Sequence, residues 1–256
     1  MDSRVVSKAI QFALVLAILA DLAGCTSVRT GQHPYSSMVK AGGMGGEVRY
    51  LLYLPESYGG DRTVKWPLVL FLHGMGESGN DLELLKKHPL PKVLETRKDL
   101  PFIVVSPQLQ YPYSGWDPQL ELLNGLLLEL QARYAVDPKR IYVTGLSMGG
   151  GGTWKMAFRF PHRFAAIVPV AGFYEYESKL LPPNISDLRD LPIWVFHGAR
   201  DTSVLLYQDE IIVEALRASG SSVKFTVYED AGHEDTWNRA YADPAVFEWM
   251  LAQHLP

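Results

Sequence analysis

The sequence predicts an α/β fold, with a mostly parallel central sheet that is covered by helices on both faces. Two observations lead to this prediction. Continuous apolar runs of strand length recur along the chain, as expected of strands that are buried on both sides. Segments with the three–four spacing of an amphipathic helix lie between these runs, and strands that alternate with helices favour a parallel sheet.

Seven strands are expected, each of them an apolar or alternating run. They cover residues 47–55, 67–73, 102–106, 140–144, 165–171, 192–197 and 223–229. Helices are expected over residues 120–134, 153–159, 205–218 and 237–253. The insertion at residues 173–190 is short, so no large lid domain is expected over this fold.

Composition limits the classes of protein to which the chain can belong. Its 256 residues are enough for one α/β domain with a single core, and 47% of them are apolar, as in a globular protein. The net charge is −4 and no long basic run is present, so we expect no nucleic-acid partner.

The N-terminus has the pattern of a targeting segment. Arg4 and Lys8 precede an apolar run at residues 12–20 that is too short to span a bilayer, so a signal peptide is expected over residues 1–24. The sequence LAGC at residues 22–25 resembles the lipobox of bacterial lipoproteins, in which the cysteine is lipidated. We therefore expect an exported cell-envelope lipoprotein that meets the membrane only through a lipid on Cys25. A periplasmic or secreted protein with an ordinary signal peptide is the alternative.

A glycine-flanked serine lies where an expected strand runs into an expected helix. The turn Gly145-Leu146-Ser147-Met148-Gly149 has the G-x-S-x-G spacing of a nucleophile elbow, in which backbone strain lifts the serine hydroxyl out of the sheet edge. Glycines are needed at both ends because neighbouring chain passes too close for a Cβ atom. We therefore assign Ser147 as a candidate nucleophile.

A serine hydroxyl needs a base to take its proton and an acid to orient that base. Of the seven histidines, only His233 lies in the loop that follows the last expected strand, which is where the base lies when the order along the chain is Ser, acid, His; His254 lies in the C-terminal tail. Asp201 comes just after the strand at 192–197, at the carboxyl end where ligands gather in open α/β sheets. The expected triad is Ser147, Asp201 and His233.

An acyl-transfer site also needs donors for the oxyanion of the tetrahedral intermediate. One is expected to be the backbone N–H of Met148, which follows the candidate nucleophile. The other is expected to be the N–H of Met75, in the sequence HGMG that follows the strand at 67–73. No metal or cofactor is required by this chemistry.

These residues together resemble the α/β-hydrolase superfamily, from about residue 47 to the C-terminus. Within it, LHGMGESGND at 72–81, VDPKRIYVTGLSMGG at 136–150, and SPQ at 106–108 followed by Trp116 resemble the group of polyhydroxybutyrate depolymerases, feruloyl esterases and predicted peptidases. The expected organisation is a signal peptide at 1–24, a glycine-rich tether at 25–46 and an α/β-hydrolase catalytic domain at 47–256.

The resemblance implies a serine carboxylic ester hydrolase that forms an acyl-serine intermediate on short-chain, aryl or polysaccharide-linked esters. It also implies that Gln108 and Trp116 can line the substrate cleft; for Trp116, a packing role is the alternative. Trp237 either flanks His233 or anchors the last helix. Two other functions stay open: a serine peptidase of the same fold, and a lipid-anchored binding protein without activity.

Overall fold

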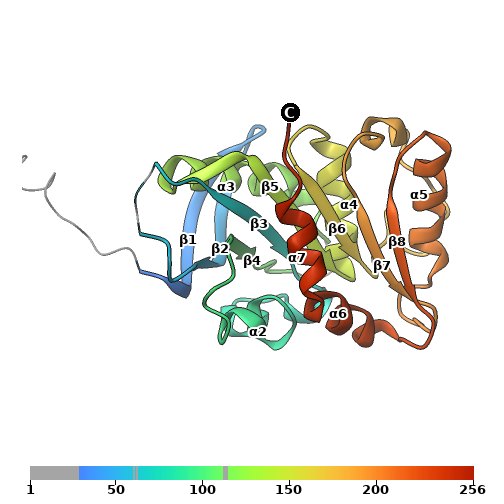
Figure 1. Ribbon diagram of the computed structural model, residues 1–256, viewed down its shortest axis with the longest axis horizontal. Coiled ribbons are helices and arrows are strands. Elements are labelled where there is room, and N and C mark those ends of the chain that lie inside the picture. Colours follow the sequence, from blue (N-terminus) through green and yellow to red (C-terminus); the bar gives the residue numbers. More distant parts are fainter. Residues whose placement is uncertain (1–28, 60, 62, 112–114) are drawn as a thin grey trace, which may run out of the picture.

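The computed structural model describes residues 29–59, 61, 63–111 and 115–256. In this part of the chain the strands form one eight-stranded sheet in the order β1-β2-β4-β3-β5-β6-β7-β8 (Figure 1). The β1–β2 and β2–β4 pairs are antiparallel and the remaining pairs are parallel, which confirms the expected mostly parallel sheet. The strands are β1 Gly31–Ala41, β2 Met44–Leu54, β3 Trp66–Leu72, β4 Ile103–Pro107, β5 Val136–Leu146, β6 Ala166–Val170, β7 Trp194–Gly198 and β8 Lys224–Tyr228.

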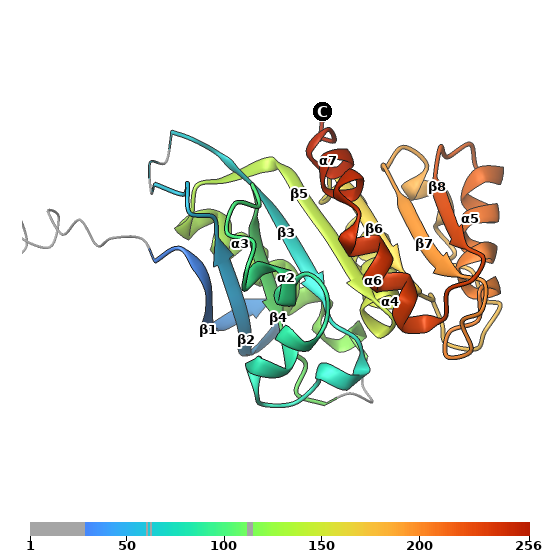
Figure 2. The same cartoon turned by 60° about the horizontal axis from the view of Figure 1, so that its bottom comes forward.

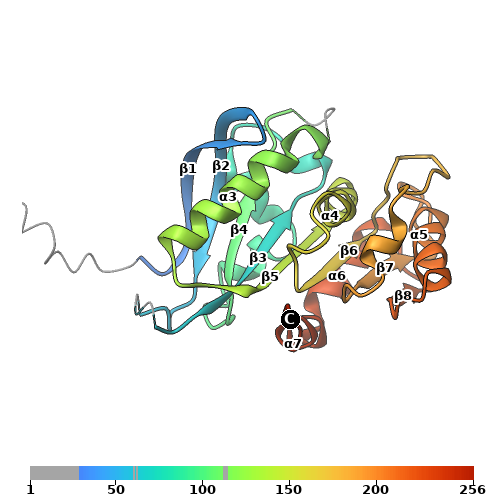
Figure 3. The ribbon, with the colours of Figure 1, turned by 90° about the horizontal axis from the view of Figure 1, so that it is seen from above.

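Helices cover both faces of the sheet. α3, α4 and α5 pack on one face, and α6 and α7 pack on the other (Figure 3). Successive residues of a strand point to opposite faces, so in β3 Leu68 and Leu70 enter the core beneath α3 and α4, and Val69 enters the core beneath α6 and α7. The helices are α2 Pro91–Leu94, α3 Leu120–Arg133, α4 Met148–Arg159, α5 Tyr207–Ala218, α6 His233–Ala242 and α7 Pro244–Leu251, with 3₁₀ turns η1 Met75–Glu77, η2 Leu82–Lys87, η4 Asp117–Gln119 and η5 Ile185–Leu188.

The expected tether at residues 25–46 is wrong for its C-terminal part, because β1 and the start of β2 lie there. The two strands form a hairpin in which Ala41 pairs with Met44. Gly42 and Gly43 make the two-residue turn with φ of 58° and 77°, a backbone region in which glycine carries no steric cost. The glycine cluster therefore marks a tight hairpin turn rather than a flexible linker.

The last expected helix is also divided. Residues 237–253 were expected to be one helix, but α6 ends before Asp243 and α7 begins at Pro244. Proline has no N–H to donate and fits the first turn of a helix, and the Asp243 side chain caps α7 by accepting a hydrogen bond from the N–H of Ala245.

The carboxyl ends of the parallel strands meet at one edge of the sheet. Leu72 at the end of β3 pairs with Gly145, and Leu146 at the end of β5 pairs with Val170. The loops that follow β3, β5, β7 and β8 therefore gather at this edge, which Figure 2 brings forward. Between β6 and β7 the described chain forms the 3₁₀ turn η5 and no larger insertion.

The expected signal peptide and Cys25 lie outside the described residues. A search of the described helices finds none that combines the length and the apolar character needed to cross a bilayer.

Candidate active site

Ser147 occupies a strained turn between β5 and α4. Its φ and ψ are 56° and −121°, a region that side-chain-bearing residues rarely adopt. The flanking glycines make this turn possible: a Cβ on Gly145 would lie 2.4 Å from the carbonyl oxygen of Gly149, and a Cβ on Gly149 would lie 1.9 Å from that of Leu72. α4 consequently begins at Met148 and runs through four glycines, earlier than the expected start at 153.

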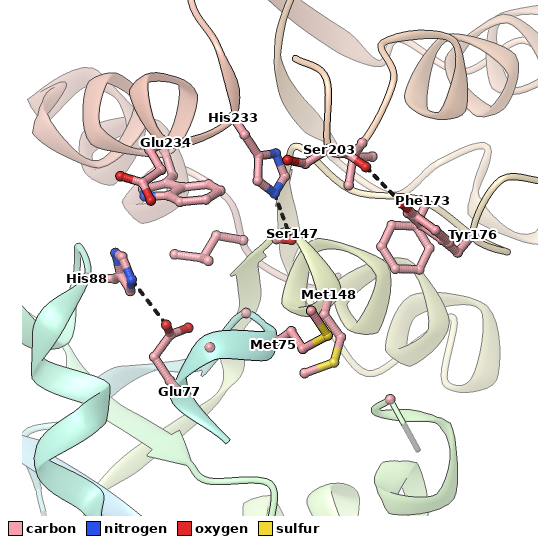
Figure 4. Close-up of a pocket in the computed structure, with 16 residues that line it drawn as sticks. Met75, Glu77, His88, Ser147, Met148, Phe173, Tyr176, Ser203, His233 and Glu234 are labelled. Carbon is pink, nitrogen blue, oxygen red and sulfur yellow. Dashed lines mark hydrogen bonds and ion pairs between the residues drawn. The ribbon is translucent and has the colours of Figure 1, made fainter. Parts of the chain in front are cut away.

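The structure brings Ser147, His233 and Asp201 together at the carboxyl edge of the sheet. The Nε2 atom of His233 lies 2.9 Å from the Ser147 Oγ (Figure 4), and its Nδ1 atom lies 2.5 Å from the Asp201 Oδ2. With Nδ1–H donating to the carboxylate, Nε2 is left to accept the serine proton. This arrangement is the one required for activating a serine hydroxyl.

Asp201 is held as a carboxylate by its surroundings. Its Oδ1 accepts hydrogen bonds of 2.9 Å from the N–H groups of both Ser203 and Val204. Burial alone would raise the pKa of Asp201, but the hydrogen bonds from His233 and from these N–H groups outweigh burial, so the pKa is lowered. Asp201 therefore stays ionised and can stabilise an imidazolium at His233.

Two backbone N–H groups are available beside the serine. Met148 is the first residue of α4 and Met75 is the first of η1, so neither N–H has an acceptor within its own helix. Both residues line the same cleft as Ser147. The loop that carries Met75 can approach this closely because Gly74 lacks a Cβ, which would lie 2.9 Å from Leu146.

Known proteins share this architecture. The model of the dienelactone hydrolase family matches residues 117–243, just under half of the chain. A solved structure described as a thermostable esterase superposes with a TM-score of 0.69 and 30% identity, covering 86% of this chain and 63% of its own. The chain belongs to the α/β-hydrolase superfamily.

Two further relatives of this α/β-hydrolase are matched over only part of their own length. The bifunctional acetylxylan esterase/xylanase XynS20E of Neocallimastix patriciarum is 31% identical over 151 residues, which are 56% of this chain and 20% of that protein. A secreted protein of Arthroderma benhamiae is 25% identical over 220 residues, 71% of this chain and 23% of its own. A solved ferulic acid esterase has the same fold, with a TM-score of 0.60 and 19% identity over 87% of this chain and 97% of its own.

A buried ion pair lies directly behind Asp201. His197, at the end of β7, places Nδ1 2.8 Å from the Asp209 Oδ2 and Nε2 2.8 Å from the carbonyl oxygen of Val204. Asp209 also accepts hydrogen bonds from the Trp154 Nε1–H and the Gly172 N–H. Because both ring nitrogens of His197 face acceptors, both carry a proton.

The protonated His197 anchors the loop that carries Asp201. Burial would lower the pKa of His197, but its hydrogen bond to Asp209 and the charges of Asp209 and Asp201 outweigh burial and raise the pKa. Its Nε2 lies 3.6 Å from the Asp201 Oδ2. His197 therefore holds the Val204 carbonyl and adds a positive charge beside the Asp201 carboxylate.

A cleft of about 580 Å³ opens beside Ser147, and its two ends differ. Figure 4 shows Glu77, His88 and Glu234 on one side of Ser147 and His233, with Phe173 and Tyr176 on the other. The further lining residues are Gly74, Met75, Gly76, Gly115, Leu146, Met148, Ser203, Val204 and Trp237. One end is therefore polar and acidic, and the other is aromatic.

The structure does not place Gln108 in this cleft, so that expectation is wrong, and for Trp116 the structure favours the alternative of a packing role. The Gln108 amide donates hydrogen bonds to the carbonyl oxygens of Glu77 and Asp81, which fixes the loop after η1. Trp116 is buried, and its Nε1–H donates to the carbonyl oxygen of His73 over 3.2 Å. Both residues support the loop that carries Met75 instead of contacting the cleft.

Trp237, by contrast, does line the cleft. Its ring lies edge-on to His233, with centroids 4.6 Å apart, and also packs in the core beneath α6 and α7. Both interpretations of this tryptophan thus hold: it flanks the histidine and it anchors the helix.

Sequence reasoning missed the polar and aromatic walls of the cleft. Glu77 lies within the stretch 72–81 that carries the resemblance, and His197 precedes a glycine at a strand end, so both had a local signal. Phe173 and Tyr176 had none, since their segment shows no periodicity and reaches the cleft only through the fold. Among the described residues, no group of three or more His, Cys, Asp and Glu side chains is gathered as a metal site would require.

Proposed function

We propose that the protein hydrolyses carboxylic esters through an acyl-serine intermediate. The observation that carries this proposal is the continuous line of contacts from Ser147 through His233 to Asp201, at 2.9 Å and 2.5 Å, in a cleft that Met75 and Met148 line from the first positions of their helices. Its relatives include proteins described as esterases, which agrees with this chemistry.

In the first half-reaction, His233 Nε2 takes the proton from Ser147 as its Oγ attacks the ester carbonyl carbon. The N–H groups of Met75 and Met148 stabilise the oxyanion that forms. The tetrahedral intermediate then collapses, and His233 returns the proton to the alcohol oxygen that leaves. In the second half-reaction His233 takes a proton from a water molecule that attacks the acyl-serine carbonyl, and it returns this proton to the Ser147 Oγ as the acid is released.

The experiment is a hydrolysis assay with p-nitrophenyl acetate and butyrate and with a feruloyl ester. We expect turnover by the wild-type protein and a loss of several orders of magnitude in Ser147→Ala, because a triad serine acts together with its base. A fluorophosphonate probe should label the wild type and leave Ser147→Ala unlabelled. Wild-type turnover in Ser147→Ala, or no turnover of any ester together with no labelling, would refute the proposal.

A matched ester and anilide of one acyl group separates an esterase from a peptidase. The proposed function predicts much faster cleavage of the ester after each rate is divided by that of alkaline hydrolysis. Equal normalised rates would favour the peptidase.

We also propose that the protein is exported and carries a lipid on Cys25, on the basis of the apolar run at 12–20 and the sequence LAGC at 22–25. Expression in a bacterial host with a labelled fatty acid should label the wild type. Cys25→Ser should abolish that label and leave the precursor uncleaved. Processing of Cys25→Ser as in the wild type would indicate an ordinary signal peptide.

A further inference from the structure

The polar end of the cleft contains a buried carboxyl group that the proposed chemistry does not use. Glu77 has a side chain that is 5% exposed, and its Oε1 lies 3.1 Å from the Nε2 of His88. Its Oε2 is buried beside Gly74. Burial raises the pKa of Glu77, against the opposing effect of His88. A mostly buried carboxyl group that lines the cleft and takes no part in the proposed chemistry is a candidate for binding the substrate.

The pair of Glu77 and His88 belongs to the same wall as the catalytic histidine. The ring of His88 lies edge-on to Trp237, with centroids 5.8 Å apart, and Trp237 lies edge-on to His233. Glu234, the residue after His233, adds an exposed carboxylate to this end of the cleft (Figure 4). A group bound here therefore lies within reach of the scissile bond.

The charge of the cleft is negative or neutral on every side. None of the described residues that line it is lysine or arginine. With its carboxylate ionised, Glu77 gives the pair with His88 a net charge of zero or −1, and Glu234 adds another −1. An anionic substrate would thus meet no cation except a protonated histidine, and it would lose hydration as it enters.

The opposite end has different chemistry. Phe173 and Tyr176 lie with their rings 5.2 Å apart and nearly perpendicular, and the Tyr176 hydroxyl donates to the carbonyl oxygen of Ser203. Met148 lines the cleft between this end and the serine (Figure 4). With its hydroxyl engaged, Tyr176 offers mainly ring surface, so this end favours an apolar or aromatic group.

We propose that the substrate is an ester without negative charge, with an apolar or aromatic group at Phe173 and Tyr176 and a hydroxyl-bearing group at the other end. Hydroxyl groups fit the acidic end because carboxylates accept their hydrogen bonds, whereas an anion cannot donate any. The acidic residues Glu77 and Glu234, with His88, thus determine specificity. This inference rests on the proposed ester hydrolysis.

The charge part is tested with two matched pairs of esters. In one pair the charge is on the acyl group: p-nitrophenyl hemisuccinate and its methyl ester. In the other it is on the alcohol: 4-acetoxybenzoate and its methyl ester. We expect kcat/KM, divided by the rate of alkaline hydrolysis, to favour the neutral member of at least one pair by about tenfold at low salt, and less at high salt because salt screens exposed charges.

Variants locate the source of this preference. Glu234→Gln should reduce it by about threefold, as expected for one exposed charge, and Glu77→Gln should reduce it further. Glu214→Gln removes the same charge from the exposed face of α5, away from the cleft, and should leave the preference unchanged. Circular dichroism at the assay temperature verifies that each variant is folded.

The hydroxyl part is tested with phenylacetate esters of a methyl pentoside and of cyclohexanol. The pentoside ester should have the lower KM, and Glu234→Gln should raise its KM by a larger factor than that of the cyclohexyl ester. Hydrolysis of all neutral esters without discrimination by charge, or equal effects of Glu234→Gln and Glu214→Gln, would overturn this inference and leave ester hydrolysis intact. Failure to hydrolyse any neutral ester faster than Ser147→Ala would instead remove the proposed function and this inference with it.

Discussion

Replacing His197 with leucine tests the buried ion pair behind Asp201. Leucine fills a similar volume but leaves the Asp209 carboxylate without its cation and the Val204 carbonyl without its donor. Removing one partner of a buried pair costs about 3–5 kcal/mol. Asp209 keeps the hydrogen bonds from Trp154 and Gly172, so we expect a loss near the lower end, about 3 kcal/mol in the free energy of unfolding.

The assay is urea unfolding followed by tryptophan fluorescence. The folded state raises the pKa of His197 above its usual 6.5, so the contribution of the pair is complete below pH 6.5. It is lost as the pH rises through the raised value. The destabilisation by His197→Leu should therefore be largest at pH 6.5 and below, and smaller in alkaline buffer. The exposed His162 provides a matched control, and His162→Leu should change the stability by less than about 0.5 kcal/mol.

A double-mutant cycle with Asp209→Asn decides whether the two residues act together. Residues in direct contact show coupling of about 0.5–3 kcal/mol, so the double variant should be more stable than the sum of the single losses predicts. Additive losses, within about 0.4 kcal/mol, would refute the ion pair as the source of the effect.

Two further predictions concern the loop after β3. His73 is buried, and burial lowers its pKa to about 4, so the unfolded chain takes up a proton below pH 6.5 while the folded protein does not. Its contribution to stability should fall by about 2 kcal/mol between pH 7.5 and pH 5, measured as the difference in unfolding free energy between the wild type and His73→Gln; a difference independent of pH would contradict this. Gly149→Ala should destabilise the protein by about 2 kcal/mol or more and lower kcat, because the new methyl group would overlap the Leu72 carbonyl and displace the end of β3, whereas Gly59→Ala, which meets no atom within 4 Å, should do neither.

The candidate triad could be predicted from the sequence because its chemistry requires an order along the chain. Ser147, Asp201 and His233 each lie beyond the carboxyl end of a parallel strand, and parallel strands bring these ends to one edge of the sheet. The hairpin at β1 was missed because a glycine cluster was interpreted as a linker, although two adjacent glycines are also the signal of a tight hairpin turn.

The walls of the cleft could not be predicted in the same way. Gln108 directly follows β4, but its side-chain amide donates hydrogen bonds to two backbone carbonyls of the neighbouring loop. Phe173 and Tyr176 face the serine from a segment without regular structure, and a contact of that kind depends on the whole fold. Local sequence patterns therefore identify the residues that the proposed chemistry requires, but they do not identify the residues that line the cleft.

The strained backbone at Ser147 affects which substitutions at this position would be favoured during evolution. A side chain held at φ 56° and ψ −121° costs on the order of 1–3 kcal/mol, which the surrounding sheet and helix must absorb. Glycine at this position would release that strain, so an inactive descendant would gain stability by losing the serine hydroxyl. Activity and stability therefore favour different residues at this position. Serine, the less stable of the two, is favoured only while its hydroxyl is used.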